Sequence, residues 1–387
     1  MLSKRAINLA PSPTLALNAK AKELKASGKA VVNLSVGEPD FPTPKHIGSA
    51  AKRAIDEGFT HYTATPGIIE LRKALQIKFS RDNGLEYDID QIIVGVGSKQ
   101  LLYNALQVLV ESGDEVLIPT PVWSTYVEQV KLAEGTPVFI KLDPPFKLTA
   151  KDVEKAITKK TKALMLNSPN NPSGAMIEES ELKKIVELAV ENNIFVISDE
   201  IYEFITYGKK QVSIASFGKK ITDLTITING FSKSYAMTGW RIGYAGGPKK
   251  IIKAMSSIQG QTTSNTSSIG QIAAIEALRG TAEPMKKMIS EFAKRRRYLL
   301  EEFGNIPNLK ITDPEGAFYL FFDITDLTDG KSSSADWCEK LLKEKFVALV
   351  PGEAFYADGY VRMSYAASMQ ELKEGVKRIK EYISHNK

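Results

Sequence analysis

Residues 230–244 have the sequence GFSKSYAMTGWRIGY, in which Lys233 lies eight positions before Arg241. A lysine amine can form an imine with an aldehyde, and an environment that lowers its pKa from about 10.4 leaves the free amine available as a base. Arg241 and the hydroxyl of Ser232 are suited to clamp a phosphate group through a charge-assisted hydrogen bond and a neutral one. Because most lysines are solvated surface residues, the spacing and not the lysine alone carries the prediction.

The chain around this segment has two patterns. From about residue 91 to residue 227, short β-rich runs alternate with helical periodicity, which predicts βαβ units and an α/β fold with a mostly parallel sheet covered by helices. The predicted strands are 91–96, 115–118, 137–141, 162–167, 194–198 and 224–228, and the predicted helices include 99–110, 124–133 and 178–191.

After the glycine-rich passage at 239–247, the pattern changes. A long helix is predicted at 283–303, followed by shorter strands and a final helix at 369–383, which indicates a smaller α+β domain. We therefore predict a large domain at 40–282 and a small domain formed by 1–39 and 283–387, packed against each other with a ligand site between them.

Composition excludes several classes of function. The 387 residues, 43% hydrophobic and 25% charged, are typical of a soluble globular protein with two cores. No apolar stretch reaches the roughly 18 residues of a spanning helix, and the N-terminus lacks an apolar signal core, so we expect a cytoplasmic protein without a membrane role. One cysteine, Cys338, and three histidines offer no metal-ligand spacing, so we expect no metal site. The net charge of +6 comes from scattered residues, so we expect no nucleic-acid partner.

Polar residues follow two of the predicted strands. Asp199 comes directly after the apolar run 194–197, at the carboxyl end of a parallel strand, where α/β folds bind ligands. A helix N-cap is the alternative role for this aspartate. Asn171 lies in the segment SPNNPSG at 168–174, which by itself is typical of a proline-rich turn.

Two further strand-to-helix turns are candidates for ligand contacts. Gly97, Ser98 and Lys99 lie between a predicted strand and helix, so their backbone amides and the helix N-terminus can receive a phosphate. Trp123 lies in the segment PTPVWSTY at 119–126, where a packing role is the alternative.

These segments together resemble the class I, fold-type I, pyridoxal-phosphate-dependent aminotransferases, and the resemblance spans essentially the whole chain. It implies pyridoxal 5′-phosphate as cofactor and Lys233 as the catalytic lysine that holds it. In the family, an aspartate at the position of Asp199 pairs with the pyridine nitrogen, and a tyrosine at the position of Tyr202 contacts the ring hydroxyl. Asn171 would contact the ring hydroxyl and the substrate carboxylate, and Trp123 would stack on the ring. The implied phosphate cup consists of Gly97, Ser98, Lys99, Ser232 and Arg241.

The resemblance also assigns substrate contacts and a partner. Arg362, in YVRMSY at 360–365, would grip the α-carboxylate through a planar fork. Gly37, in NLSVGEPDF at 33–41, would let the backbone approach the substrate. Tyr62 matches a tyrosine that reaches the phosphate of the neighbouring subunit, which implies a homodimer with shared active sites, although a packed loop tyrosine is the alternative.

The side chain of the substrate is the least constrained feature. Residues 256–271 contain no basic residue, and the segment QTTSNT at 261–266 resembles the bacterial subgroup Ib of the aspartate aminotransferases. There, residues at the positions of Lys99 and Thr14 bind the distal carboxylate, and Thr14 lies in an N-terminal segment that we expect to close over the site.

The resemblance therefore implies transfer from L-aspartate to 2-oxoglutarate. Because a lysine is less selective than an arginine fork, glutamate, prephenate and aromatic substrates stay open. A fold does not fix a reaction, so the same scaffold is also compatible with a β-lyase and with a regulator that only senses the cofactor.

Overall fold

The largest sheet has seven strands in the order β2-β8-β7-β6-β5-β3-β4. The structure is a computed structural model that describes residues 2–3, 6–7, 9–10, 13–328 and 332–385. Strand β8 is antiparallel to both of its neighbours, and the other pairs in the sheet are parallel. The predicted, mostly parallel sheet is therefore confirmed. Its strands are β2 (Ile92–Gly95), β3 (Glu115–Thr120), β4 (Thr136–Lys141), β5 (Thr161–Asn167), β6 (Phe195–Asp199), β7 (Thr225–Gly230) and β8 (Gly243–Gly246).

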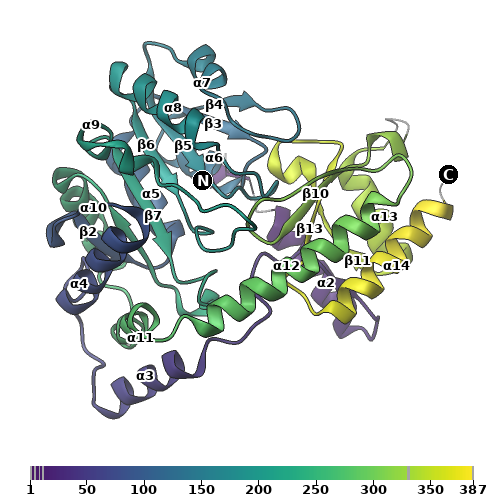
Figure 1. Ribbon diagram of the computed structural model, residues 1–387, viewed down its shortest axis with the longest axis horizontal. Coiled ribbons are helices and arrows are strands. Elements are labelled where there is room, and N and C mark those ends of the chain that lie inside the picture. The colour runs from purple at the N-terminus through teal and green to yellow at the C-terminus, as the bar shows by residue number, and fades with distance from the viewer. Residues whose placement is uncertain (1, 4–5, 8, 11–12, 329–331, 386–387) are drawn as a thin grey trace.

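Helices cover both faces of this sheet (Figure 1). The alternation along β3 explains why, since Val116 and Ile118 join the core beneath α5, α6 and α10, whereas Leu117 joins the core beneath α7, α8 and α9. Helices α3, α4 and α11 pack at the β2 end of the sheet. These helices are α3 (Lys45–Asp56), α4 (Ile69–Lys78), α5 (Ser98–Leu109), α6 (Thr125–Leu132), α7 (Ala150–Ala156), α8 (Glu179–Glu191), α9 (Lys219–Thr222), α10 (Lys249–Thr262) and α11 (Ser268–Arg279).

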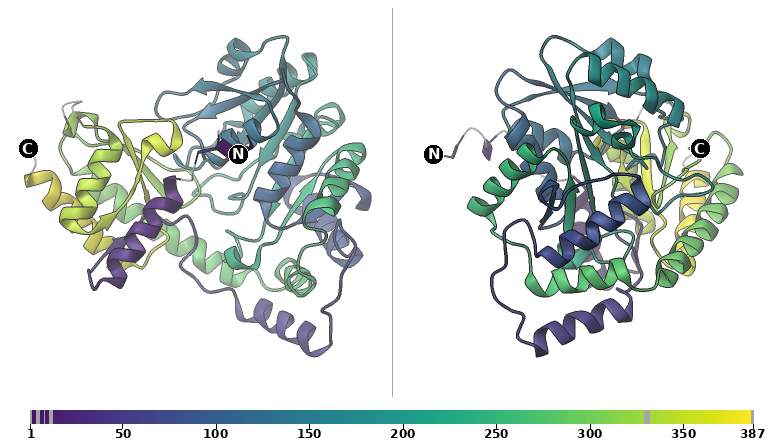
Figure 2. Two further views of the ribbon diagram at one scale, coloured as in Figure 1. Left: turned by 180° about the vertical axis from the view of Figure 1, so that it is seen from behind. Right: turned by 60° about the vertical axis from the view of Figure 1, so that its left-hand side comes forward.

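A second, smaller layer is built from the two ends of the chain. Its antiparallel sheet has the order β12-β13-β10-β9, and β1 pairs with β11 in a separate parallel ladder. Figure 2 shows α2 beside the C-terminal elements, and the long helix α12 connects the two layers in Figure 1. The elements are α2 (Pro13–Ala26), β1 (Val32–Asn33), α12 (Glu283–Gly304), β9 (Lys310–Thr312), β10 (Tyr319–Asp323), α13 (Ser334–Lys345), β11 (Val347–Ala348), β12 (Val350–Pro351), β13 (Tyr360–Ser364) and α14 (Met369–His385).

Short helical turns connect several of these elements. One is a π-helical turn and the others are 3-10 turns. They are η1 (Phe79–Asn83), η2 (Ile89–Gln91), η3 (Ile214–Phe217), η4 (Thr238–Trp240), η5 (Thr325–Leu327) and η6 (Gly352–Phe355). The division into domains at 40–282 and at 1–39 with 283–387 stays a prediction, and the pairing of β1 with β11 supports it.

Strand β8 was not predicted, because its sequence GYAG lacks β-branched residues. Its small residues have a packing reason. A Cβ atom on Gly243 would lie 2.4 Å from the backbone nitrogen of Ser98, and one on Gly246 would lie 2.4 Å from the ring of Tyr87. Close approach of the start of α5 and of the Tyr87 ring therefore selects glycine over the usual strand formers.

Two expectations from composition, on a membrane-spanning helix and on a metal site, can be compared with the described residues. In that part of the chain, no helix combines the length and apolar character needed to cross a membrane. No group of three or more His, Cys, Asp or Glu side chains within the same ranges is placed to hold a metal ion. Cys338 is buried in α13, and burial raises the pKa of its thiol, as expected for a packing residue.

Candidate active site

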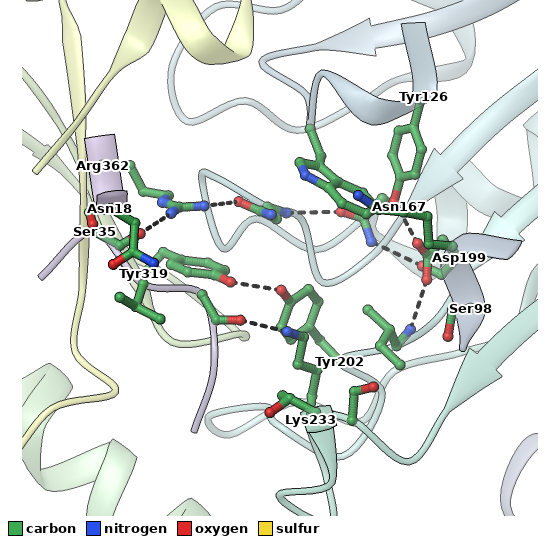
Figure 3. Close-up of a pocket in the computed structure, with 18 of the residues that line it drawn as sticks. Asn18, Ser35, Ser98, Tyr126, Asn167, Asp199, Tyr202, Lys233, Tyr319 and Arg362 are labelled. Carbon is green, nitrogen blue, oxygen red and sulfur yellow. Dashed lines mark hydrogen bonds between the residues drawn. The ribbon is translucent and has the colours of Figure 1, made fainter. Parts of the chain in front are cut away.

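A cavity of about 340 Å³ lies where the carboxyl ends of the parallel strands face the smaller layer. Side chains from both layers point into it (Figure 3). This cavity is lined by most of the site residues that were predicted from the sequence. They are Gly37, Ser98, Lys99, Trp123, Asn171, Asp199, Tyr202, Ser232, Lys233, Arg241 and Arg362.

Lys233 follows β7 and reaches the floor of the cavity. Its Nζ donates a hydrogen bond to the carbonyl oxygen of Gly37 at 2.5 Å. Burial lowers the pKa of Lys233 to about 8, and the nearby charges of Arg362 and Arg241 lower it as well, while Glu38 raises it. Near neutral pH the uncharged amine is therefore more populated than it is for an ordinary lysine.

Asp199 ends β6 and is buried at the back of the cavity. The hydroxyl of Tyr126 donates to its Oδ2 at 2.6 Å, and the amide of Ile201 donates to its Oδ1 at 3.2 Å. Burial raises the pKa of Asp199 to about 6, and these hydrogen bonds and the charge of Lys233 oppose the rise. The residues that follow form a turn, so the alternative of a helix N-cap is wrong. At pH 7 the group is an anion prepared for a positively charged ligand atom.

Arg362 lies on β13 on the opposite side of the cavity, with 3% of its surface exposed. Its Nη1 donates to Oδ1 of Asn171 at 2.9 Å, and its Nη2 donates to the carbonyl oxygen of Ser35 at 2.7 Å. The Nε atom has no partner among the described residues. A buried guanidinium with an unused donor fits a carboxylate ligand, because the group would otherwise carry an uncompensated cost of burial.

Asn171 connects this arginine to the strand ends. Its side chain accepts from Arg362, and its backbone amide donates to Oδ1 of Asn167 at 2.9 Å. Asn167 in turn donates to the carbonyl oxygen of Asp199 at 3.0 Å. The loop at 168–174 is thus a turn whose asparagine also points at the arginine.

A cup suited to an anion lies at the start of α5. Gly97 precedes the helix with φ 77° and ψ 164°, a conformation favoured by glycine alone. A Cβ atom at this position would lie 2.6 Å from Nη2 of Arg241. Arg241 is held by a hydrogen bond from its Nη1 to the carbonyl oxygen of Thr238 at 2.9 Å. The helix N-terminus, the guanidinium and Ser232 border one cavity, which fits a phosphate.

Lys99 and Trp123 lie next to each other at the cavity. The Nζ atom of Lys99 is 4.6 Å from the centroid of the Trp123 ring. Partial burial and the charge of Arg241 both lower the pKa of Lys99. The lysine is therefore a single, adaptable positive charge at the place where a ligand would enter.

Two nominated residues in the described part of the chain, Gly97 and Tyr62, are not among those that line the cavity. The side chain of Tyr62 is 92% exposed in the single chain. Thr14 belongs to the first turn of α2, but its side chain lies outside the described residues. Asn18, one turn further along this helix, lines the cavity and accepts a hydrogen bond from Asn33 at 2.8 Å.

Sequence reasoning missed several residues that line the cavity. Tyr126 and Tyr319 look like ordinary buried aromatics, and Asn167 and Ser35 are inconspicuous polar residues. The available signal for Tyr126 was its position three residues after Trp123, in the first turn of a helix at a strand end. The signal for Tyr319 was a hydroxyl in the otherwise apolar run 317–322.

Comparisons with known proteins agree with this geometry. Residues 29–379 match the family described as "Aminotransferase class I and II". The "Aspartate aminotransferase" of Bacillus subtilis (strain 168) is 46% identical, with 99% of this chain and 98% of the relative covered. The "Probable aspartate/prephenate aminotransferase" of Aquifex aeolicus (strain VF5) is 44% identical, with 98% of each covered.

Solved structures are similar over the same length. The aspartate aminotransferase of Rhizobium meliloti has a TM-score of 0.95 at 42% identity, with 99% of each chain covered. The aspartate aminotransferase of Thermus thermophilus with maleate also has a TM-score of 0.95, at 41% identity, with 98% of this chain and 99% of that chain covered.

Proposed function

The chain belongs to the class I and II aminotransferase family, and on this premise we propose that it moves the amino group of L-aspartate to 2-oxoglutarate. The products are oxaloacetate and L-glutamate. The observation that carries the proposal is the one cavity lined by the amine of Lys233, the buried carboxylate of Asp199 and the guanidinium of Arg362, whose Nε has no partner among the described residues. The relatives named aspartate aminotransferase support the choice of substrate.

The family's cofactor is pyridoxal 5′-phosphate, and the donors in the cavity fit it. The turn at Gly97 with Arg241 is suited to its phosphate, Asp199 to its pyridinium nitrogen, and the ring of Trp123 to its face. Bound there, the cofactor supplies an electrophilic carbon and a ring that withdraws electrons from the substrate Cα. Burial keeps the amine of Lys233 partly unprotonated near neutral pH, as attack on such a carbon requires.

Each residue in the cavity has a separate proposed role, which follows from its position. Arg362, supported by Asn171, binds the substrate α-carboxylate and fixes the Cα atom near Lys233. The Nζ atom of Lys233 would take the proton from the substrate Cα and hold it for return to the reacting molecule. The carboxylate of Asp199 would stabilise a protonated ring nitrogen of the bound cofactor, and the hydroxyl of Tyr202 would donate to its ring oxygen. The reverse steps with a 2-oxo acid complete the cycle.

Lys99 is the proposed contact for the distal carboxylate, together with Thr14. A lysine binds carboxylates as a point charge, so a larger dicarboxylate such as prephenate is a second candidate substrate. The relative named aspartate/prephenate aminotransferase supports this second candidate. Lys99→Ala is expected to raise KM for L-aspartate more than KM for an amino acid without a distal carboxylate.

We also propose a cytoplasmic homodimer with shared active sites. Tyr62 is the residue on which this proposal rests, because its side chain, 92% exposed in the single chain, is free to reach a partner subunit.

Product analysis tests the proposed reaction. Purified enzyme loaded with cofactor is incubated with L-aspartate and 2-oxoglutarate, with Lys233→Ala as the control. Equal amounts of oxaloacetate and L-glutamate, absent in the control, are expected. Release of ammonia without formation of glutamate would instead indicate a lyase.

A further inference from the structure

Tyr319 occupies a central position between the two layers. On the ladder of β10 and β13, Tyr319 pairs with Ser364, which lies two residues after Arg362. Residues directly opposite each other, and residues two apart on a strand, point to the same face, so Tyr319 and Arg362 form a diagonal pair on one face. The guanidinium carbon of Arg362 lies 4.4 Å from the centroid of the Tyr319 ring. The tyrosine has only 1% of its surface exposed.

The hydroxyl of Tyr319 reaches across to the larger layer. Its Oη lies 2.8 Å from Oη of Tyr202. A dashed line marks this hydrogen bond in Figure 3. On the other side, a Cβ atom at Gly37 would lie 2.7 Å from the same oxygen. The absence of a side chain at Gly37 therefore makes room for the contact between the two tyrosines, and any larger residue would displace it.

Each of the two hydroxyls has a single proton, and this decides which tyrosine donates in their hydrogen bond when the cofactor is bound. Burial raises the pKa of both hydroxyls above the ordinary tyrosine value, and the charge of Arg362 counteracts the rise for Tyr319. Each tyrosine therefore has one proton to donate and can also accept. If Tyr202 donates its proton to the cofactor ring oxygen, the contact of 2.8 Å persists only with Tyr319 as donor to Tyr202.

We propose that Tyr319 is a positioning residue that links the substrate-binding guanidinium of Arg362 to the cofactor contact of Tyr202. The inference rests on the proposed function, because it takes Arg362 and Tyr202 as the substrate and cofactor contacts. The positive charge of Arg362 lies over the Tyr319 ring and strengthens the Tyr319 hydroxyl as a donor. Linked hydrogen bonds also polarise one another. A substrate carboxylate on Arg362 reduces that charge. The ring oxygen of the cofactor thus responds to whether the carboxylate site is filled.

Tyr319→Phe tests the link, because it removes the hydroxyl and keeps the ring on Arg362. The visible absorbance of the cofactor-loaded enzyme is titrated against pH, with and without maleate, a dicarboxylate that lacks an amino group. Loss of one buried hydrogen bond is expected to raise the proton affinity of the bound cofactor by about 2- to 10-fold, since the anionic ring oxygen loses support. The change caused by maleate is expected to be smaller than in the wild type, whereas KM for L-aspartate changes little.

A matched control and a double variant make the result specific. Tyr365→Phe removes a buried hydroxyl whose contact, 3.2 Å from the carbonyl oxygen of Ala317, lies outside the cavity, and it should titrate like the wild type. If Tyr319 acts through Tyr202, the double variant Tyr202→Phe/Tyr319→Phe shifts the titration no further than Tyr202→Phe alone.

Four outcomes would overturn the proposal. If Tyr319→Phe titrates like the wild type, or if the shifts add in the double variant, Tyr319 does not act through Tyr202. The enzyme would still transaminate in either case, so the proposed function would stand. A wild-type enzyme that forms no complex with the cofactor would overturn the proposed function and this inference together. If Tyr319→Phe does not fold, Tyr202→Phe provides the test. A maleate response in Tyr202→Phe equal to that of the wild type would contradict the proposed link between Tyr319 and Tyr202.

Discussion

Burial changes the acidity of Lys233 and Asp199 in opposite directions, and both changes suit the proposed chemistry. The pKa of the amine falls to about 8 and that of the carboxyl rises to about 6. Between pH values of about 6 and 8, the carboxylate of Asp199 is mostly charged and part of the Lys233 population is an uncharged amine. Perturbed groups of this kind, gathered in one cavity, are typical of catalytic sites.

The lowered pKa of Lys233 predicts how the cofactor-free chain captures pyridoxal phosphate. Only the uncharged amine reacts, so the rate of capture should rise with pH around a midpoint of about 8. Stopped-flow absorbance measures this rate, and Lys233→Ala provides the background from other lysines. A midpoint close to the ordinary value of 10.5 would contradict the proposed environment of Lys233.

Individual residues were predictable from the sequence where a motif isolated them. Lys233, Arg241 and Asp199 lie in segments whose spacing carries information, and the structure places them at one cavity. Tyr126 and Tyr319 were not predictable, because their roles depend on what the fold brings opposite them. A buried tyrosine in an apolar run has the same pattern whether or not its hydroxyl meets a functional group.

Among the elements, the turn before α5 has the strictest backbone requirement. Gly97→Ala would place a side chain in a conformation that costs about 1–3 kcal/mol, and its Cβ would displace Arg241. Because a displaced Arg241 would lose a charge-assisted hydrogen bond to the phosphate, worth about 1.5–3 kcal/mol, we expect cofactor binding to weaken about tenfold or more. Equilibrium dialysis with pyridoxal phosphate measures the change.

A matched control separates backbone strain from loss of the phosphate cup. Gly218 precedes α9 with φ 114° and ψ 170°, and a Cβ atom there meets nothing within 4 Å. Gly218→Ala should therefore cost stability without weakening cofactor binding. Equal weakening in both variants would show that the cup at Gly97 is not the phosphate site.

A buried ionic cluster fixes the turn after β6 to α4 and η1. Lys78 contacts Glu203 at 2.5 Å and Asn83 at 2.6 Å, and Asn83 donates to Glu203 at 2.8 Å. Burial and the charge of Glu203 raise the pKa of the adjacent Glu200 to about 7. The cluster lies directly behind the segment that carries Asp199.

Lys78→Met should lower the free energy of unfolding by about 3–5 kcal/mol, because it leaves a buried carboxylate unpaired. Lys78→Met/Glu203→Gln, which removes both charges, should recover more than half of the loss. Urea unfolding measures both, with Lys131→Met, from an exposed pair with Glu128, as a control worth about 1 kcal/mol or less. A double variant as unstable as the single one would contradict the ionic origin of the effect.

Elements were predictable where hydrophobic period and strand propensity agreed. The six predicted strands and the long helices at 283–303 and 369–383 have counterparts in β2 to β7, α12 and α14. Strand β8 was not predicted because its glycines are selected by contacts with the start of α5 and with the ring of Tyr87, and not by strand propensity. Tertiary packing overrides local preference there.

For the whole molecule, the proposed homodimer predicts complementation between inactive subunits. In a mixed dimer of Tyr62→Ala and Lys233→Ala, one site carries both defects and the other carries neither. Random mixing should therefore restore about a quarter of the wild-type sites. Activity is measured after the two variants are unfolded and refolded together. A mixture no more active than the mean of its two parents would contradict shared active sites.

The joining of distant segments was the hardest feature to predict at this scale. The cavity takes Gly37 from near the N-terminus, Lys233 from the middle of the chain and Arg362 from near its end. Hydrophobic periodicity predicts the elements but not which ends meet, so the resemblance to a known family carried that part of the prediction.

The central claim is that Lys233 is the catalytic lysine in the transfer of the amino group of L-aspartate, and one spectrum tests it most directly. L-Aspartate alone is added to the cofactor-loaded enzyme, and the absorbance of the cofactor is followed, with Lys233→Ala as the control. We predict conversion to the spectrum of the cofactor's amine form in the wild type only, reversed by 2-oxoglutarate. An unchanged wild-type spectrum after addition of L-aspartate would contradict the account.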